Sequence, residues 1–430
     1  MSNVRKRVYQ VFDPAPLGSD QTDLYVDLDD VRGSTGIVQK LADAIRLASG
    51  PTCQILAGHR GSGKSTELHK LQRQLEQGGE RFFVVFCQSD DDIDRNDVDF
   101  PEVLIAVVRQ MAAQLKKRAE TSLKPGVLKT AFERIKGLPG SIELEGIEIG
   151  AELFKISATI KGSPETRTEV RKALEPHTGS LLEAANDVIG QAALELQKKG
   201  FRGLVILVDD LDKMVLRPHP TAGCSTGVHL FVNREAQLSG FESHMVYTMP
   251  LALAYSGQEQ TIANLYGGHV PVLPMTKIRQ RPPDGQPDAE GTARFRDLIA
   301  KRLVSINVKA SEVFQGDDVR DRLIALSGGQ PRELMILIRE AIVGGELPID
   351  MGAVDRAARE GRRAYARQLR AEHWPIIEQV RQTGSITRTQ ENDELVRDLL
   401  DSRAILQYVN DKEWYADNPV IAELKAPPSP

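Results

Sequence analysis

Short runs of apolar residues alternate along this chain with longer segments in which apolar residues recur every three or four positions. The short runs predict β-strands, and the longer segments predict amphipathic α-helices. Strands are predicted over residues 53–57, 81–87, 204–208, 244–250 and 269–273. Helices are predicted over residues 36–49, 64–75, 101–118 and 227–238. This alternation is typical of an α/β fold with a parallel sheet. The run at 204–208 is apolar throughout, which predicts a central strand buried on both faces.

A different pattern separates the second and third predicted strands. Apolar and polar residues alternate over 142–149 and again over 154–160, with a slip of phase at Gly146. Such alternation predicts a β-hairpin with a bulge at the glycine. Two helices are predicted after it, the second opening on the capping-box pattern Ser180-x-x-Glu183. We interpret residues 121–200 as an insertion in the α/β fold.

Breaker residues indicate where the regular elements stop. Proline and glycine predict an irregular segment over residues 8–33. The acidic run at 90–94 lacks the glycine and terminal glutamate of a calcium loop, so a solvated turn is predicted there. A linker rich in Pro, Gly and Asp at 281–288 separates the sheet from a region predicted to be all-helical.

The first predicted strand leads into a phosphate-binding loop. Gly58, Gly63, Lys64 and Ser65 match the spacing G-x-x-x-x-G-K-[ST]. Glycines let successive backbone N–H groups turn inward around phosphates, and the following helix adds its positive N-terminal end. Lys64 can reach the β- and γ-phosphates, and the Ser65 hydroxyl can bind Mg²⁺. We predict ATP and Mg²⁺ as ligands. The residues predicted to bind the nucleotide are Gly58, Gly61, Ser62, Gly63, Lys64, Ser65 and Thr66.

Carboxylates follow the central strand at 204–208, at the end where α/β sheets bind ligands. This arrangement is the Walker B pattern. Asp209 is predicted to hold Mg²⁺, mostly through water, opposite Ser65. Asp210 stands where a general base would polarise the attacking water, and Asp212 is the competing candidate.

Composition restricts the partners and the cellular compartment that we expect for this protein. The net charge of −5 gives no general attraction to nucleic acid, so such binding would need a local basic patch. Three cysteines without paired spacing favour a reducing compartment and argue against zinc or disulfides. No apolar run approaches the ~20 residues of a membrane helix, and the basic N-terminus is not followed by the apolar segment of a signal peptide. We expect a soluble, cytoplasmic protein with no membrane contact.

The order of these motifs resembles the AAA+ ATPases, most closely the initiator-like and STAND-type branches. The resemblance covers residues from about 24 to 418 and is most specific at the P-loop and Walker B. It implies four parts. These are a lead-in segment at 1–50, a P-loop ATPase core at 51–285, a helical lid at 286–372 and a winged helix at 373–430. The winged helix would contain helices at 373–382 and 391–402, followed by a hairpin at 404–415.

The same resemblance assigns roles to four further residues. Thr248, at the end of the fourth strand, matches sensor 1, which reads the γ-phosphate. Arg332, in Gly-Gly-x-Pro-Arg, matches sensor 2, which ties the lid to the nucleotide. Tyr25 and Val26 are candidates for the adenine pocket, with ordinary packing as the simpler interpretation.

Two departures from the family pattern favour a slow switch over a fast ring motor. Asp210 stands where most ring-forming members have Glu, and its shorter side chain lies farther from the attacking water. Between Thr248 and Val270 the chain has no Arg or Lys, although ring members carry an arginine finger there. Possible substitutes in shifted positions are Arg234, Arg279 and Arg281.

Three functions are compatible with this reading. In the first, ATP closes the lid through Arg332, and the insertion or the winged helix reports that state to an effector protein, with homo-oligomers forming on ATP binding. Anti-phage defence or signalling in bacteria would suit it by fold-level analogy. The second is a DNA-acting initiator or loader. The third is a ring-forming remodelling motor, which needs a trans-acting arginine.

Charge patterns near the C-terminus bear on the DNA alternative. Arginines on one face of segment 350–371 are Arg356, Arg359, Arg363, Arg367 and Arg370, opposite Val354, Ala358, Tyr365 and Leu369. Such a stripe can contact phosphates, although a solvated face is the simpler interpretation. The predicted reading helix carries Glu391, Asp393, Glu394, Asp398 and Asp401 against only Arg397. Its carboxylates would be repelled in the major groove, so we expect this helix to contact protein rather than DNA.

Overall fold

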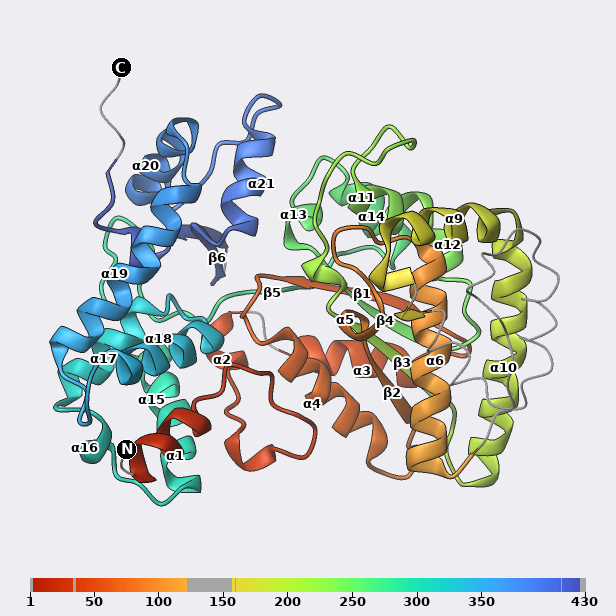
Figure 1. The fold of residues 1–430 in the computed structure, drawn as a ribbon, viewed down its shortest axis with the longest axis horizontal. Helices are drawn as coiled ribbons and strands as arrows, with labels where there is room; N and C mark the ends of the chain where they lie inside the picture. Colours follow the sequence, from red (N-terminus) through yellow and green to blue (C-terminus); the bar gives the residue numbers. More distant parts are fainter. Residues whose placement is uncertain (1–2, 34–35, 122–156, 159, 411, 426–430) are drawn as a thin grey trace. The chain divides into compact units, whose positions relative to one another are not determined.

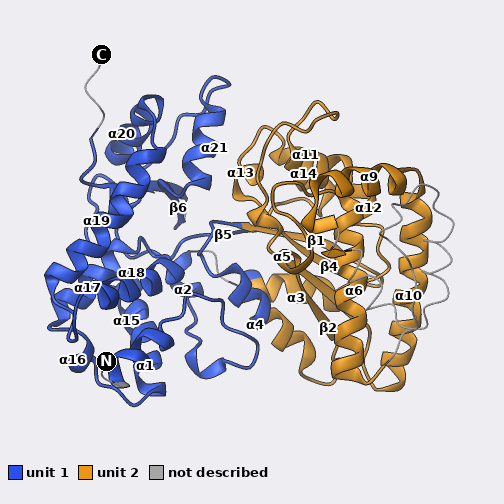
Figure 2. Cartoon of the chain, in the orientation of Figure 1, with its two compact units in different colours: residues 1–37, 58–69, 272–430 blue, residues 38–57, 70–271 orange. Residues whose placement is uncertain are grey.

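The computed structural model describes residues 3–33, 36–121, 157–158, 160–410 and 412–425 (Figure 1). Within these residues the chain forms two compact units (Figure 2). Unit 1 contains residues 1–37, 58–69 and 272–430, and unit 2 contains residues 38–57 and 70–271. Unit 1 therefore includes the P-loop together with the whole C-terminal part of the chain.

A five-stranded parallel sheet confirms the predicted α/β fold class. Its strands are β1 Cys53–Gly58, β2 Phe83–Gln88, β3 Leu204–Asp209, β4 His244–Met249 and β5 Val272–Leu273. Their order is β2-β3-β4-β1-β5, so β3, β4 and β1 lie inside the sheet. All of β3 is buried, as its unbroken apolar run predicts. The division between the units passes through this sheet, because Gly58 and β5 are counted with unit 1.

The fifth strand is shorter than predicted. Residues 269–271 precede it without strand structure, and Pro271 lacks the N–H that a ladder needs. Its carbonyl still accepts the N–H of Ala57 at 2.9 Å, so the chain runs alongside β1 before β5 begins.

Unit 2 contains two long helices between β2 and β3 in the chain. Helix α6, Phe100–Ala119, has Asp99 as its N-cap and Pro101 in its first turn, and most of its residues are buried. Helix α10 spans Thr178–Lys198. The described residues also form α3 Ile37–Leu47, α4 Lys64–Glu76, α5 Ser89–Asp92, α9 Pro164–Leu174, α11 Thr226–Val228, α12 Glu235–Leu238, α13 Leu251–Ala254 and α14 Glu259–Leu265. Helices α3 and α4 begin in unit 1 and continue into unit 2.

Several local predictions in unit 2 are wrong. The helix predicted over 227–238 is interrupted by a π-helical turn, His229–Asn233. The helix predicted to open at Ser180 begins earlier, at Thr178, with His177 as the N-cap. The hairpin over 142–160 lies mostly outside the described residues. Its described end, 157–158 and 160, is helical, since alternation over so few residues fits a helical turn as well as a strand.

The acidic run at 90–94 is also not the solvated turn that was predicted. It begins within α5, and Asp92 is buried. Arg109 Nε lies 2.5 Å from the Asp92 carboxylate, and the side chain of Gln110 donates to it at 2.6 Å. A buried carboxylate is tolerated here because a cation and an amide share its charge.

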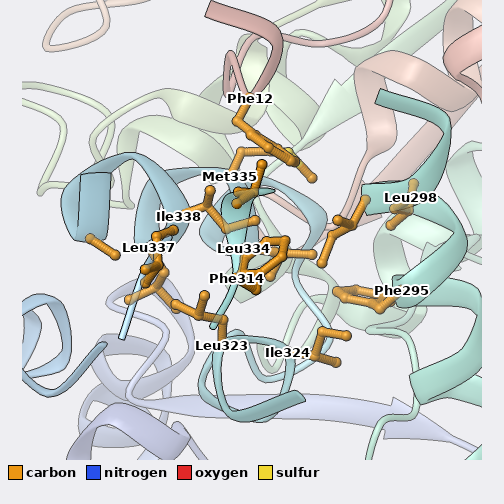
Figure 3. Packing of buried hydrophobic residues seen from close by; sticks show 14 of the residues in the cluster. Phe12, Phe295, Leu298, Phe314, Leu323, Ile324, Leu334, Met335, Leu337 and Ile338 are labelled. Atoms are coloured by element: carbon orange, nitrogen blue, oxygen red, sulfur yellow. The ribbon is translucent and has the colours of Figure 1, made fainter. Parts of the chain in front are cut away.

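Unit 1 contains the helical region after residue 286. Its helices are α15 Ala289–Ser305, α16 Ala310–Val313, α17 Asp317–Leu326, α18 Pro331–Val343 and α19 Met351–Gln368. They enclose one hydrophobic core, in which Phe295, Phe314 and Met335 lie among leucines and isoleucines (Figure 3).

The lead-in segment contributes to this core, which corrects the prediction of an irregular stretch over 8–33. It contains α1 Asn3–Val11, the 3-10 turn Thr22–Leu24 and α2 Asp29–Arg32. Val8 and Phe12 are fully buried in the core of the helical region. Figure 3 shows Phe12 there. Their i, i+4 spacing is that of a helix face, a signal hidden by the prolines that follow.

The C-terminal elements occur in the predicted order, two helices and then a hairpin. They are α20 Trp374–Thr383, α21 Asp393–Asp401, β6 Ile405–Val409 and β7 Glu413–Asp417. Strands β6 and β7 are antiparallel, with Gln407 opposite Tyr415. The Tyr408 and Trp414 rings stack with centroids 4.3 Å apart and form a buried cluster with Met275. No helix in the described ranges is long and apolar enough to cross a membrane.

Candidate nucleotide-binding site

The loop after β1 has a backbone that only glycine adopts easily. Gly61 and Gly63 have φ values of 85° and 103°. A Cβ on Gly61 would lie 3.3 Å from Arg332 Cβ, and a Cβ on Gly63 would lie 3.1 Å from Arg32 Nη2. A Cβ on Gly58 would come within 2.8 Å of the Leu273 carbonyl oxygen. The glycines of the motif thus permit both the turn and the close approach of two arginines.

Lys64 lies back over this loop. Its Nζ donates to the carbonyl oxygens of Gly58, at 2.7 Å, and His59, at 2.9 Å. The Ser62 hydroxyl is buried and has no hydrogen-bond partner among the described residues. A cation, a buried unpaired hydroxyl and a loop whose glycines have positive φ fit the phosphate groups of ATP.

The two hydroxyl residues that open α4 lie in different surroundings. Ser65, predicted to bind both nucleotide and Mg²⁺, is half-buried in the first turn. Thr66 Oγ1 accepts the backbone N–H of Leu17 at 3.3 Å, so this hydroxyl holds the lead-in segment.

Arg32 is a residue of this site that the sequence interpretation missed. Its guanidinium is buried and donates to the Ser62 carbonyl at 2.6 Å and to Glu67 at 2.9 Å. Tyr25, one of the adenine-pocket candidates, donates its hydroxyl to the same Glu67 at 3.2 Å. The other candidate, Val26, is buried in the hydrophobic core of unit 1. The sequence marks Arg32 only by its place before Gly33. An isolated arginine does not predict an ion pair with a residue 35 positions away.

Arg332, the predicted sensor 2, has its side-chain stem beside Gly61 of the P-loop. It stands in the first turn of α18, after Pro331, and its side chain is exposed. The preceding Gln330 is fully buried, and its Oε1 has no partner among the described residues. The structure therefore brings the arginine of the helical region to the P-loop within unit 1.

In unit 2 the acidic residues after β3 form a compact cluster. One carboxylate oxygen from each of Asp209, Asp210 and Asp212 lies within 4.8 Å of the others, and all three residues are buried. Three converging carboxylates are a donor set that Mg²⁺ accepts. These residues therefore fit a divalent cation.

Asp210 combines an unusual backbone with an ion pair. Its φ of 71° lies in the left-handed region, where aspartate is among the few residues found. Lys213 Nζ is 2.5 Å from its carboxylate and 2.9 Å from that of Asp90. Burial raises the pKa of Asp210, and the hydrogen bond from Lys213 opposes that rise. Burial also acts to raise the pKa of Asp90, but hydrogen bonds from Arg95 and Lys213 lower it to about 2.

Thr248, the predicted sensor 1, is fully buried at the end of β4. Its Oγ1 accepts the backbone N–H of Asp212 at 3.4 Å. The hydroxyl thus ties the end of β4 to the acidic turn.

The three arginines considered as substitutes for an arginine finger are all engaged. Arg234 donates to Asp99 at 3.1 Å, Arg279 donates to Asp417 at 3.3 Å, and Arg281 donates to the Thr383 carbonyl at 3.2 Å. Each has a structural role within its own unit.

A second cluster, Asp99, His219 and His229, has ligand atoms within 4.8 Å but does not suit a metal. His219 Nδ1 accepts the N–H groups of Thr221, at 3.3 Å, and Ala222, at 3.1 Å. The neutral ring therefore carries its proton on Nε2 and has no lone pair there. Asp99 is already shared by Arg234 and by His229, 3.4 Å away. We interpret this cluster as a structural network.

No protein-family model matches the chain, and no curated protein matches its sequence. Among solved structures it is similar to the Walker-type ATPase PABY2304 of Pyrococcus abyssi, with 13% identity and a TM-score of 0.48 over 96% of this chain and 99% of that one. It is similar to Cdc6p of Pyrobaculum aerophilum, with 11% identity and a TM-score of 0.41 over 96% and 94%. It is also similar to the ORC2 protein of Aeropyrum pernix, a structure of its ADPNP-ADP complexes. The identity is 10% and the TM-score 0.47, over 96% of this chain and 93% of that one.

Proposed function

We propose that this chain is a Mg²⁺-dependent ATPase of the AAA+/STAND type that hydrolyses ATP slowly and serves as a nucleotide-dependent switch or assembly module for a partner protein. The observation that carries the proposal is the packing of the Arg332 stem on Gly61 inside unit 1. A nucleotide held by the P-loop would meet the helical region directly, so the two can be coupled by one arginine.

The residues divide the chemistry as follows. The loop amides and Lys64 would hold the phosphates, and Ser65 and Asp209 would hold Mg²⁺. The ion would supply positive charge at the β- and γ-phosphate oxygens. Asp210 would polarise the attacking water. Its ion pair with Lys213 makes it a weaker base than burial alone would, which supports slow turnover.

A protein partner suits the charges of α21. Asp393 pairs with Arg397, and Asp398 pairs with Arg370 at 2.8 Å, so part of the acidic face is already neutralised within unit 1. An effector, or a second copy assembling with ATP, would contact the C-terminal elements or the segment at 121–200. We place the protein in the cytoplasm, and bacterial defence or signalling is the setting by fold-level analogy alone.

The switch proposal is tested by the size and shape of the protein with ATP, with ADP and without nucleotide. Light scattering after gel filtration and small-angle scattering both measure this. The expected result is that ATP and ADP give different shapes or assemblies. Equal size and shape with the two nucleotides would contradict the switch proposal and support only an ATPase function.

A DNA-acting initiator is the second candidate, because Arg359, Arg363 and Arg367 are exposed along one side of α19. Anisotropy of labelled duplex DNA at ~0.15 M salt, with the full chain and with all three arginines changed to Gln, tests it. Sequence-specific binding that also alters hydrolysis would favour the initiator. A ring motor would instead require ATP to produce closed oligomers with faster turnover.

A further inference from the structure

Strand β6 contacts several segments of the nucleotide site with consecutive residues. Tyr408 donates its hydroxyl to the Gly328 carbonyl at 2.8 Å, in the turn that precedes Arg332. Leu406 packs on the same turn, since a Cβ on Gly328 would lie 2.5 Å from its Cδ1. Val409, the residue after Tyr408, places its carbonyl oxygen where a Cβ on Gly33 would lie.

Gln407 lies between Leu406 and Tyr408. Its backbone N–H and C=O form hydrogen bonds to residues outside the β6–β7 hairpin. Its carbonyl accepts the N–H of Met275 at 3.1 Å. Its N–H donates to Nε2 of His59, in the P-loop, at 2.9 Å. Both residues are 1% exposed, so this N–H has no access to water as an alternative partner.

His59 also touches the phosphate-binding lysine. Its carbonyl accepts the ammonium of Lys64, while its ring accepts the amide of Gln407. A single residue at a position that the P-loop motif leaves variable therefore joins the lysine to the C-terminal hairpin. An acceptor at Nε2 requires the neutral ring, and burial, followed by the charges of Lys64 and Arg403, lowers the pKa of His59 to about 3.

We propose that His59 is a positioning residue for nucleotide binding, through which β6 holds the P-loop in its binding conformation. The inference rests on the proposed ATP-binding function. Without the ring acceptor, the buried Gln407 N–H is unsatisfied, and the structure relieves this by moving β6 away from the loop. ATP must then restore the contact when it binds, which weakens its affinity. Linkage also requires the reverse effect, so bound nucleotide must stabilise the Gln407 amide.

Two substitutions at His59 separate the hydrogen bond from ring packing. His59→Leu removes the acceptor, and His59→Gln can present its Oε1 near the position of Nε2. A matched control is His373→Leu, because His373 is another buried histidine of unit 1 whose ring accepts a backbone N–H, that of Arg370 at 3.1 Å. His373→Leu removes a similar hydrogen bond from the segment that precedes α20, outside the P-loop.

The test is the affinity of the full chain for a fluorescent ATP analogue, together with hydrogen exchange at Gln407 with and without ATP. We expect His59→Leu to bind about 10-fold more weakly, within a range of roughly 5- to 150-fold. His59→Gln should recover most of this loss, and His373→Leu should bind as the wild type does. In the wild type, ATP should slow exchange of the Gln407 amide.

The outcomes separate this inference from the proposed function. Absence of ATP binding by the wild type would overturn the function itself. Wild-type affinity in a folded His59→Leu protein, or equal losses in His59→Leu and His373→Leu, would overturn the inference alone. If His59→Leu does not fold, unchanged Gln407 exchange in the wild type with saturating ATP would overturn it equally.

Discussion

Arg32 and Glu67 form a buried ion pair beside the P-loop, with 2.9 Å between Nη1 and Oε1 and side chains 1% and 3% exposed. Removing Arg32 takes the paired guanidinium away from the buried Glu67 carboxylate, in a site that excludes water. We therefore expect Arg32→Ala to lower the free energy of unfolding by about 3–5 kcal/mol. Urea denaturation measures this loss.

An exposed ion pair of the same unit provides the control. Arg294 pairs with Asp30, with side chains 41% and 53% exposed. Arg294→Ala should lower the free energy of unfolding far less than Arg32→Ala does, because solvent screens both charges. Similar losses in the two variants would contradict the role given to burial.

Asp210 is expected to act in hydrolysis rather than in binding. Asp210→Asn should lower kcat by about 100-fold or more and leave the affinity for ATP unchanged, as expected for a general base. Steady-state kinetics with a parallel binding titration measure both. If Asp212→Asn loses turnover while Asp210→Asn does not, Asp212 is the base.

Lys213 offers a test of the same assignment by pH. Its hydrogen bond and charge lower the pKa of Asp210 against the effect of burial. Lys213→Met should therefore raise that pKa further. Since the base acts in its ionised form, activity on the acid side of the profile should be lost at higher pH than in the wild type. An unshifted pH profile would show that Lys213 does not set the pKa of the catalytic base.

Arg332 should couple the nucleotide to the conformation of the helical region. Its stem contacts the P-loop at Gly61, and its charge can engage a phosphate from there. Arg332→Ala should keep ADP binding but abolish the difference between the ATP and ADP states in small-angle scattering. A variant that still distinguishes the two nucleotides would show that another group reads the γ-phosphate.

His59 predicts a specific loss of stability in acid. Burial, aided by Lys64 and Arg403, lowers its pKa from 6.5 to about 3. Between these values the unfolded chain binds a proton that the folded chain does not, so stability is complete above pH 6.5 and falls as the pH falls. From pH 6.5 to pH 5 the loss from this residue is about 2 kcal/mol. His59→Gln should lack this component, which denaturation at both pH values measures against the wild type.

The sheet and the P-loop could be predicted from the sequence because their signals are local. An apolar run predicts β3 wherever it pairs, and the spacing from Gly58 to Ser65 carries its own geometry. The order of the C-terminal helices and hairpin was predictable for the same reason. The roles of Asp209, Asp210, Thr248 and Arg332 remain predictions, although the structure gives each a defined environment.

The contacts that link distant segments could not be predicted. Arg32 meets Glu67, and His59 meets Gln407, only because the chain folds back over 35 and 348 residues. Neither pair leaves a periodic pattern in the sequence. The π-helical turn at 229–233 was missed because an inserted residue preserves the apolar face on either side.

ATP binding that depends on Lys64 is the central claim, and calorimetry of the wild type and Lys64→Ala tests it most directly. The ammonium is a ligand for phosphate, so its removal should weaken ATP binding by about 100-fold. Circular dichroism should show a folded variant, and Lys309→Ala, at an exposed lysine of the same unit, should bind normally. Unaltered ATP affinity in a folded Lys64→Ala protein would contradict the account.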